Sequence, residues 1–122
     1  MPDKRKSFED LDVFKRAYKV SLEVHKISKT FPSDEQFSLA DQIRRASKSV
    51  CANICEGFAK QIGSKREFKR YVLISLASSD EVRMWLRYSF DLGYIKKDQW
   101  QKLRDEYQEI SKMLHGLYKS LK

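Results

Sequence analysis

Apolar residues recur every three or four positions along nearly the whole chain, and this periodicity restricts the fold more than any other feature. The first apolar series is spaced 4, 3, 4, 3 and 4 residues apart, at Val13, Ala17, Val20, Val24, Ile27 and Phe31. Residues at this spacing share one face of an α-helix, and that face has to be buried against other helices. We expect the helix to end at Phe31-Pro32, because proline disfavours helical geometry in the residue before it.

Three further segments repeat the pattern. The second carries Leu39, Ile43, Ala46, Val50, Ile54 and Gly57 on one face. The third carries Phe68, Val72, Ser75, Ser79, Val82, Leu86 and Phe90, and the fourth carries Trp100, Leu103, Tyr107, Ile110, Leu114, Leu117 and Leu121. Ser33 and Ser38 are both candidate N-caps for the second helix. Ser64 and Glu67 form an S-x-x-E capping box at the start of the third helix, and Gly93 is a natural stop at its end.

These segments predict an all-α, up-down-up-down antiparallel four-helix bundle that occupies residues 1–122 as a single domain. The helices are expected at about residues 10–31, 36–60, 64–92 and 97–121. A chain of 122 residues suits one domain, and no stretch approaches the roughly 18 uninterrupted apolar residues of a membrane span. The charged N-terminus leads into no apolar signal core, so we expect a soluble cytoplasmic protein without a membrane partner.

The chain is basic, because 25 Lys and Arg outnumber 17 Asp and Glu and give a net charge of +8, which suits a polyanionic partner. The densest basic run surrounds the expected second turn and comprises Lys60, Lys65, Arg66, Lys69 and Arg70, opposed only by Glu67. In a cyclic assembly this end of the bundle forms a basic rim for a phosphate backbone. Arg44 and Lys48 share another face of the second helix and are weaker nucleic-acid-binding candidates. A solvated charge run without a ligand is the alternative.

The third helix carries more apolar residues than one core face needs. Its second apolar sector comprises Leu73, Ile74, Ala77, Met84, Trp85, Tyr88 and Leu92. A helix that is apolar almost all round is buried on more than one side, and in so short a chain the second side points to another subunit. We therefore expect an oligomer interface on this sector, with Trp85 and Tyr88 as its anchors. A wide core face filled by irregular packing is the alternative.

Polar residues form a stripe beside the apolar face of the second helix. The stripe comprises Gln42, Arg45, Ser49, Asn53 and Glu56, spaced 3, 4, 4 and 3 residues apart. We interpret it as a buried hydrogen-bonded network that sets the helix register. In this interpretation Glu56 and Glu81 pair with Arg44 or Arg45 inside the bundle. The alternative is a polar functional site at a bundle or subunit seam.

The sequence contains no visible catalytic apparatus. Cys51 and Cys55 lie four residues apart, which suits packed thiols on a helix rather than a disulfide, and no histidine lies nearby to complete a zinc set. His25 and His115 are isolated, and there is no P-loop, GxGxxG, HExxH or Glu-x-x-His pair. We expect no enzyme activity, no catalytic residue, no metal and no cofactor.

Short motifs along the chain carry a family resemblance. They are Phe31-Pro32 followed by Glu35, Gln42-Ile43-Arg44-Arg45-Ala46 followed by Ser49, Ala52-Asn53-Ile54, Glu56-Gly57, Ala77-x-Ser79-x-Glu81, Gly93-Tyr94-Ile95 and Met113-Leu114-x-Gly116-Leu117. With these motifs the chain resembles the four-helix-bundle proteins named for the intervening sequences of bacterial 23S ribosomal RNA. The run from Gln42 to Gly57 is the most specific part. Cys55 and Ser78 depart from the family pattern, which tends to have Ala and Gly there.

The resemblance implies an all-α bundle, commonly assembled as a homopentamer and often encoded within an insertion of the large-subunit rRNA gene. Some distant relatives accompany reverse transcriptases and bind nucleic acid. The family brings no established catalytic residues. Two functions follow as expectations: an oligomeric protein that binds RNA or another nucleic acid through backbone contacts, or a scaffold or adaptor for a ribosomal or reverse-transcriptase protein partner, with no nucleic-acid binding of its own.

Overall fold

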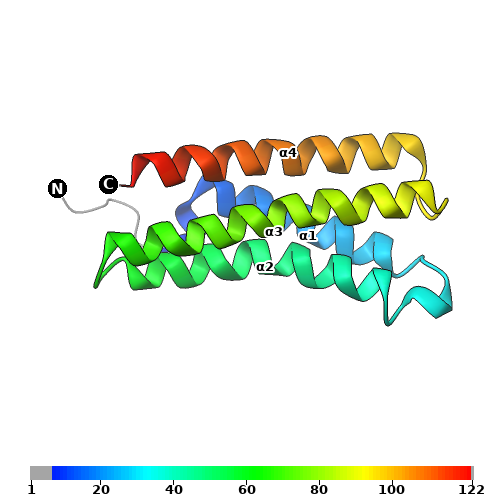
Figure 1. Cartoon of the computed structure of the whole chain (residues 1–122), viewed down its shortest axis with the longest axis horizontal. Helices are drawn as coiled ribbons and strands as arrows, with labels where there is room; N and C mark the ends of the chain where they lie inside the picture. The colour runs from blue at the N-terminus through cyan, green and yellow to red at the C-terminus, as the bar shows by residue number, and fades with distance from the viewer. Residues whose placement is uncertain (1–6, 122) are drawn as a thin grey trace.

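A computed structural model describes residues 7–121, which form four long α-helices and two single-turn 3₁₀ helices and contain no strand (Figure 1). The α-helices are α1 (Asp12–Ser28), α2 (Leu39–Lys60), α3 (Lys65–Asp91) and α4 (Lys97–Ser120), and the short helices are η1 (Phe8–Asp10) and η2 (Ser33–Glu35). Each α-helix contacts the next one along the chain, and α4 returns to contact α1, so that α1 and α3 lie on a diagonal. The predicted antiparallel four-helix bundle is confirmed.

None of the helices in residues 7–121 combines the length and the hydrophobicity that crossing a bilayer requires.

The periodic apolar series of the sequence form the core. From α1 and α2 the buried residues include Val13, Ala17, Val20, Val24, Leu39, Ile43, Ala46, Val50 and Ile54. From α3 and α4 they include Phe68, Val72, Val82, Leu86, Trp100, Leu103, Tyr107, Ile110 and Leu114. Phe90 of α3, Leu117 of α4 and Leu121, the C-cap residue of α4, are partly buried and pack against this cluster. The buried core therefore runs the length of the bundle and becomes partly exposed at its ends.

The first helix ends earlier than the sequence predicts. It stops at Ser28. Phe31 lies beyond the end of the helix and is buried, and its ring centroid is 5.4 Å from that of Tyr94. Gln36 Nε2 donates hydrogen bonds to the carbonyl oxygens of Ser28 and Phe31, each at 3.0 Å. The last carbonyl groups of a helix lack their usual donors four residues on. The Phe31 N–H donates to the Ser28 carbonyl oxygen at 3.2 Å, and the Gln36 side chain adds a donor to each of the two carbonyls.

The two candidate caps of the second helix have different roles. Ser33 begins η2, whereas Ser38 is the N-cap residue of α2 and its hydroxyl donates a hydrogen bond to Glu35. Tyr94 Oη also donates to Glu35, at 2.7 Å, which ties the α1–α2 connection to the α3–α4 connection. The Ser38 and Tyr94 hydrogen bonds hold the pKa of the Glu35 carboxyl below its usual range.

Small residues bring α3 close to both of its neighbours. Ser75 Oγ donates to the carbonyl oxygen of Val50 on α2 at 2.7 Å, and Ser79 Oγ donates to the carbonyl oxygen of Tyr107 on α4 at 3.2 Å. Both serines are fully buried, and these hydrogen bonds satisfy hydroxyls that would otherwise be costly in the core. Near the end of α2, a Cβ atom built on Gly57 would lie 2.6 Å from Tyr71 Cβ.

We predict opposite effects for two Gly→Ala substitutions inside helices. Gly57→Ala should lower the free energy of unfolding by about 1–3 kcal/mol, because the added methyl group forces α2 and α3 apart. Gly116→Ala should raise it by about 0.5–1 kcal/mol, because no atom lies within 4 Å of the new Cβ and alanine favours the helix. Urea unfolding at one protein concentration measures both. Equal effects of the two substitutions on the free energy of unfolding would show that α2 and α3 can move apart at Gly57 without cost.

Candidate nucleic-acid interface

The basic residues of the sequence meet at the turn between α2 and α3. Lys60 is the last residue of α2, and the chain turns so tightly that the N–H groups of Gly63 and Ser64 both donate to the Lys60 carbonyl oxygen, at 3.1 and 3.2 Å. Ser64 then caps α3, because its Oγ accepts a hydrogen bond from the Glu67 N–H at 3.4 Å. We call the residues Lys60, Lys65, Arg66, Lys69 and Arg70 the basic end.

Three members of the basic end rest against other side chains. Lys60 Nζ lies 5.8 Å and Arg70 Cζ 5.1 Å from the centroid of the Tyr71 ring. Lys69 Nζ lies 4.6 Å from the centroid of the Tyr118 ring on α4. Arg70 also forms an exposed ion pair with Glu67 at 3.1 Å. Contacts of this kind hold the long side chains in place while their charges stay at the surface.

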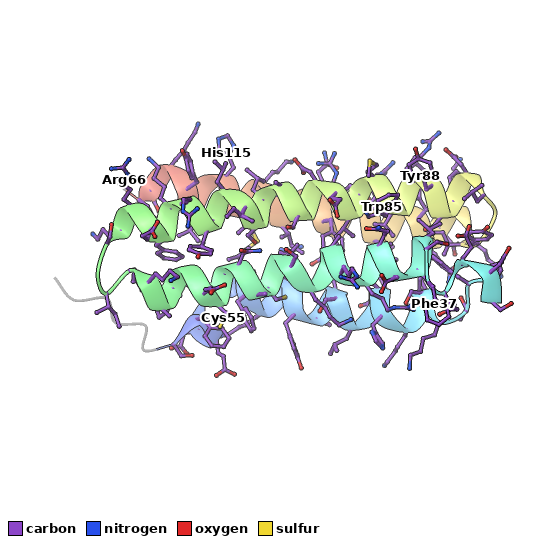
Figure 2. All side chains as sticks on the ribbon, turned by 60° about the horizontal axis from the view of Figure 1, so that its bottom comes forward. Phe37, Cys55, Arg66, Trp85, Tyr88 and His115 are labelled. Atoms are coloured by element: carbon purple, nitrogen blue, oxygen red, sulfur yellow. The ribbon has the colours of Figure 1, made fainter. Side chains whose placement is uncertain are left out.

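Lys65 and Arg66 are exposed in the first turn of α3, and no ion pair or ring contact involves them within residues 7–121. Figure 2 shows Arg66 pointing away from the bundle at this end. These two cations are therefore the members of the basic end that can pair with a phosphate without breaking a contact of their own. Arginine adds two parallel donors for phosphate oxygens, and lysine adds a point charge.

Helix α4 extends the basic end in a way that the sequence analysis missed. Its last turns carry the exposed residues His115 and Lys119, and α4 ends beside the α2–α3 turn (Figures 1 and 2). These residues lie about 50 positions from Lys65 in the sequence, so a scan for local charge runs does not group them. The antiparallel topology groups them, because the second and fourth helices end at the same end of the bundle.

Arg44 and Lys48 do not belong to this surface. At 1.5 Å per residue, Lys48 lies about 18 Å from Lys60 along α2. Arg44 uses its guanidinium in the α1–α2 connection, where it donates to Ser28 Oγ at 3.0 Å and to the Gln36 carbonyl oxygen at 2.8 Å. We correct the assignment of Arg44: its donors hold a loop instead of a nucleic acid. Lys48 Nζ lies 3.0 Å from His25 Nδ1, on the α1 side of α2.

The polar stripe of α2 is not one buried network, and the interpretation made from its spacing is wrong for the single chain. Gln42, Arg45 and Glu56 are exposed, and Arg45 pairs with Asp41 on its own helix at 2.8 Å. Arg45 and Glu56 are eleven residues apart, about 16 Å along one helix, and cannot reach each other. Nor does either arginine pair with Glu56 or Glu81 within residues 7–121.

Only the middle of the stripe is hydrogen-bonded as expected. Ser49 Oγ lies 2.8 Å from Ser78 Oγ on α3, and Asn53 Nδ2 donates to Ser49 Oγ at 3.0 Å. This cluster links α2 to α3 at mid-length. Ser78 of α3 thus supplies an interhelical hydrogen bond.

The second apolar sector of α3 lies on the outer surface. Leu73, Ile74, Met84 and Tyr88 are exposed, and so is Ala77. Trp85 differs, because it is partly buried over the α2–α3 seam and its Nε1 donates to Glu81 at 3.4 Å (Figure 2). The alternative of a wide core face is therefore wrong for most of the sector, which the four-helix core leaves uncovered.

Other clusters of polar side chains in residues 7–121 are weaker candidates for a functional site. No group of three or more His, Cys, Asp or Glu side chains is placed to hold a metal ion. Cys51 and Cys55 are free thiols, and burial raises the pKa of Cys51 to about 11, which disfavours its reactive thiolate. A surface hollow of about 560 Å³ beside Trp100 gathers three arginines. Their ion pairs, Arg83–Asp80, Arg87–Asp91 and Arg104–Asp105, balance its charge.

The fold and this surface define a basic, all-α bundle protein whose densest charge lies at one end. The family model of the 23S rRNA-intervening sequence proteins matches residues 9–116, and the chain belongs to that family. Its structure is similar to the crystal structure of a protein of unknown function from the S23 ribosomal protein family of Bacteroides thetaiotaomicron. The TM-score is 0.79 at 25% sequence identity, and the match covers 88% of this chain and 95% of the other. A search of curated proteins found no match.

We predict that two adjacent arginines differ in their effect on stability. Arg44→Ala should lower the free energy of unfolding by roughly 1–3 kcal/mol, because it removes the hydrogen bonds that Arg44 donates to Ser28 and Gln36. Arg45→Ala should change it by less than about 1 kcal/mol, because it removes an exposed i,i+4 ion pair. Both substitutions remove one positive charge, so Arg45→Ala is the matched control in a urea unfolding series. A smaller effect for Arg44→Ala would contradict its structural role.

Proposed function

We propose that this protein is a non-enzymatic, oligomeric bundle protein that binds RNA through its phosphate backbone at the basic end. The observation that carries the proposal is the gathering of five cations around one turn, two of them without an internal partner. Membership of the 23S rRNA-intervening sequence family supports RNA as the polyanion. The family resemblance further supports a homopentamer as the assembled form.

Assembly multiplies the charge of the basic end. Each chain carries +8, so five copies carry +40 on one particle. If the bundles stand side by side around an axis, the basic ends form a continuous rim, and a flexible RNA strand can contact several subunits at once. Linked contacts of this kind raise the overall affinity well above that of one site.

The chemistry of the basic end suits backbone recognition. Lys65 and Arg66 supply charge-assisted donors to phosphate oxygens, and the first N–H groups of α3 lie between them at the positive end of a helix dipole. The chain has no RRM, KH or zinc-finger signature, so nothing in it indicates the reading of base edges. We therefore expect affinity to depend on charge and strand shape more than on base sequence.

The proposal predicts a salt dependence that the basic end controls. The logarithm of the RNA affinity should fall with the logarithm of salt concentration by about 0.7–0.9 per phosphate contact. The variant Lys65→Glu, Arg66→Glu, Lys69→Glu should bind more weakly and with a flatter slope. The matched control, Lys26→Glu, Lys29→Glu, Lys97→Glu, makes the same charge change at the opposite end. Filter binding or fluorescence anisotropy with a single-stranded RNA gives both slopes.

Two outcomes of this series would remove the basic end from the mechanism. One is an equal loss in both triple variants, which would report net charge alone. The other is unchanged affinity and slope in the variant of the basic end. Light scattering on the three proteins ensures that they are compared in the same assembly state.

A second function is favoured by a different observation, the exposed apolar sector of α3. An apolar surface left uncovered by the core is typical of a protein–protein contact site. It suits a scaffold or adaptor for a protein partner, such as a ribosomal or reverse-transcriptase protein. A stable oligomer that shows no affinity for any nucleic acid at low salt would favour this function over RNA binding.

We predict that the same sector mediates self-assembly. Tyr88 is 52% exposed, so Tyr88→Glu places a charge at the interface without disturbing the core. It should yield smaller particles that remain fully helical by circular dichroism. The double variant Trp85→Glu, Tyr88→Glu should have the stronger effect, since large aromatic side chains are the usual energetic anchors of interfaces. Unchanged mass by light scattering in the double variant would contradict this assignment.

A further inference from the structure

A second apolar surface lies on the opposite side of α2 from the α3 sector. Between α1 and α2 there is a groove of about 340 Å³, lined mainly by apolar atoms of Tyr18, Leu22 and Cys51, with His25 and Lys48 at one side. Tyr18 is 52% exposed and Leu22 48% exposed, so the single chain does not cover the groove. No element of residues 7–121 contributes to it besides α1 and α2.

The groove and the outer side of α3 together account for the exposed apolar surface of the helices. Among residues 7–121 nine large hydrophobic side chains are exposed, and seven of them belong to these two surfaces: Tyr18, Leu22, Leu73, Ile74, Met84, Tyr88 and Leu92. The other two, Phe37 and Ile62, lie in connections between helices. We call the exposed residues on the outer side of α3, from Leu73 to Leu92, the C-cap residue of α3, the ridge. A ridge and a groove on one chain are the two halves of a heterologous contact.

Hydrogen bonds inside the bundle show which parts of the ridge and the groove lie at the same height. Ser75 is bonded to Val50, and Ser49 to Ser78, so Ala77 on α3 lies level with residues 48–50 of α2. Lys48 contacts His25, so this end of the groove lies at that same level, and Leu22, Tyr18 and Cys51 extend the groove away from it. Rotation about an axis parallel to the bundle keeps heights unchanged. A neighbouring copy related by such a rotation therefore brings Ala77 to the part of the groove between Leu22 and His25, within about one helical turn of Leu22.

Charge at this level is complementary. Lys48 lies at the edge of the groove, and the positive charges of Lys48, Lys29 and Arg44, together with partial burial, lower the pKa of His25. The ridge carries Glu81, which is exposed one turn beyond Ala77 and has no ion pair within residues 7–121. Helices α1 and α3 run in the same direction. Glu81 follows Ala77 along α3, and His25 follows Leu22 along α1, so Glu81 and His25 are displaced toward the same end of the bundle. The acidic residue of the ridge thus meets the basic edge of the groove.

We propose that the ridge of one copy docks into the α1–α2 groove of the next, with Leu22 seated over the small residue Ala77 and Glu81 against Lys48. This inference rests on the assembly part of the proposed function and names the two faces that meet. The groove faces out between α1 and α2, and the ridge lies on α3, across the diagonal from α1. The two faces are therefore not antipodal, so repeated contacts turn around an axis, and a rotation per copy that divides a full circle closes them into a ring.

Cysteine cross-linking tests the pairing directly. In a Cys51→Ala, Cys55→Ala background, three proteins are compared: Leu22→Cys alone, Ala77→Cys alone, and both together. After mild oxidation, the double variant should give a ladder of covalent multimers on a non-reducing gel, and each single variant should stay monomeric. A dimer from Ala77→Cys alone would show that ridge packs on ridge. A dimer from Leu22→Cys alone would show that groove packs on groove. Either dimer, or no ladder from the double variant, would overturn the proposal.

A charge exchange provides a second measurement that does not depend on disulfide geometry. Lys48→Glu and Glu81→Lys should each shift light-scattering mass toward the monomer, and the two together should restore the assembly. The reciprocal recovery distinguishes this contact from a general loss of folding, which circular dichroism monitors in each variant. Failure of the double variant to recover, with all variants folded, would overturn the Lys48–Glu81 pairing. RNA affinity is measured separately, so a ladder from a protein that does not bind RNA supports the interface while removing the proposed function.

Discussion

Close contact between α2 and α3 is the constraint on which the rest of the structure depends. Gly57 leaves no room for a side chain against Tyr71, Ser75 donates across the contact to Val50, and Ser49 and Ser78 join their hydroxyls at mid-length. Bulky residues at these positions would separate the helices, and the interhelical bonds would be lost. The contact also sets the relative height of the two helices and makes the turn between them tight.

The tight α2–α3 turn has an electrostatic consequence. It holds Lys60 near Lys65 and Arg66. Neighbouring like charges repel each other unless anions or aromatic ring faces offset the repulsion. Tyr71 and Tyr118 provide part of that compensation, and Glu67 provides another part. The remaining positive potential at one end of the bundle is the physical basis for assigning a polyanionic partner to this surface. Stability and the proposed function therefore share the same turn.

The core of four helices satisfies one face of each helix, and it leaves α3 and the α1–α2 groove with apolar surface in water. No further element of residues 7–121 covers these surfaces. This explains why the polar stripe of α2 faces outward in the single chain: Gln42, Arg45 and Glu56 flank the surface that we assign to assembly. A helical spacing of three and four residues places side chains on one face, and that face can contact another helix of the same chain or another subunit.

The sequence by itself determined the fold class, the helix order and most of the core, because a spacing of three and four residues places each apolar series on one helix face. It also located the basic run, whose members are neighbours along the chain. Only the tertiary structure decided which partners the polar and charged side chains have. Arg44 turns to a loop, Arg45 and Glu56 stay apart, and α4 adds His115 and Lys119 to the basic end. Such pairings depend on helix height, rotation and side-chain reach, which a one-dimensional pattern does not contain.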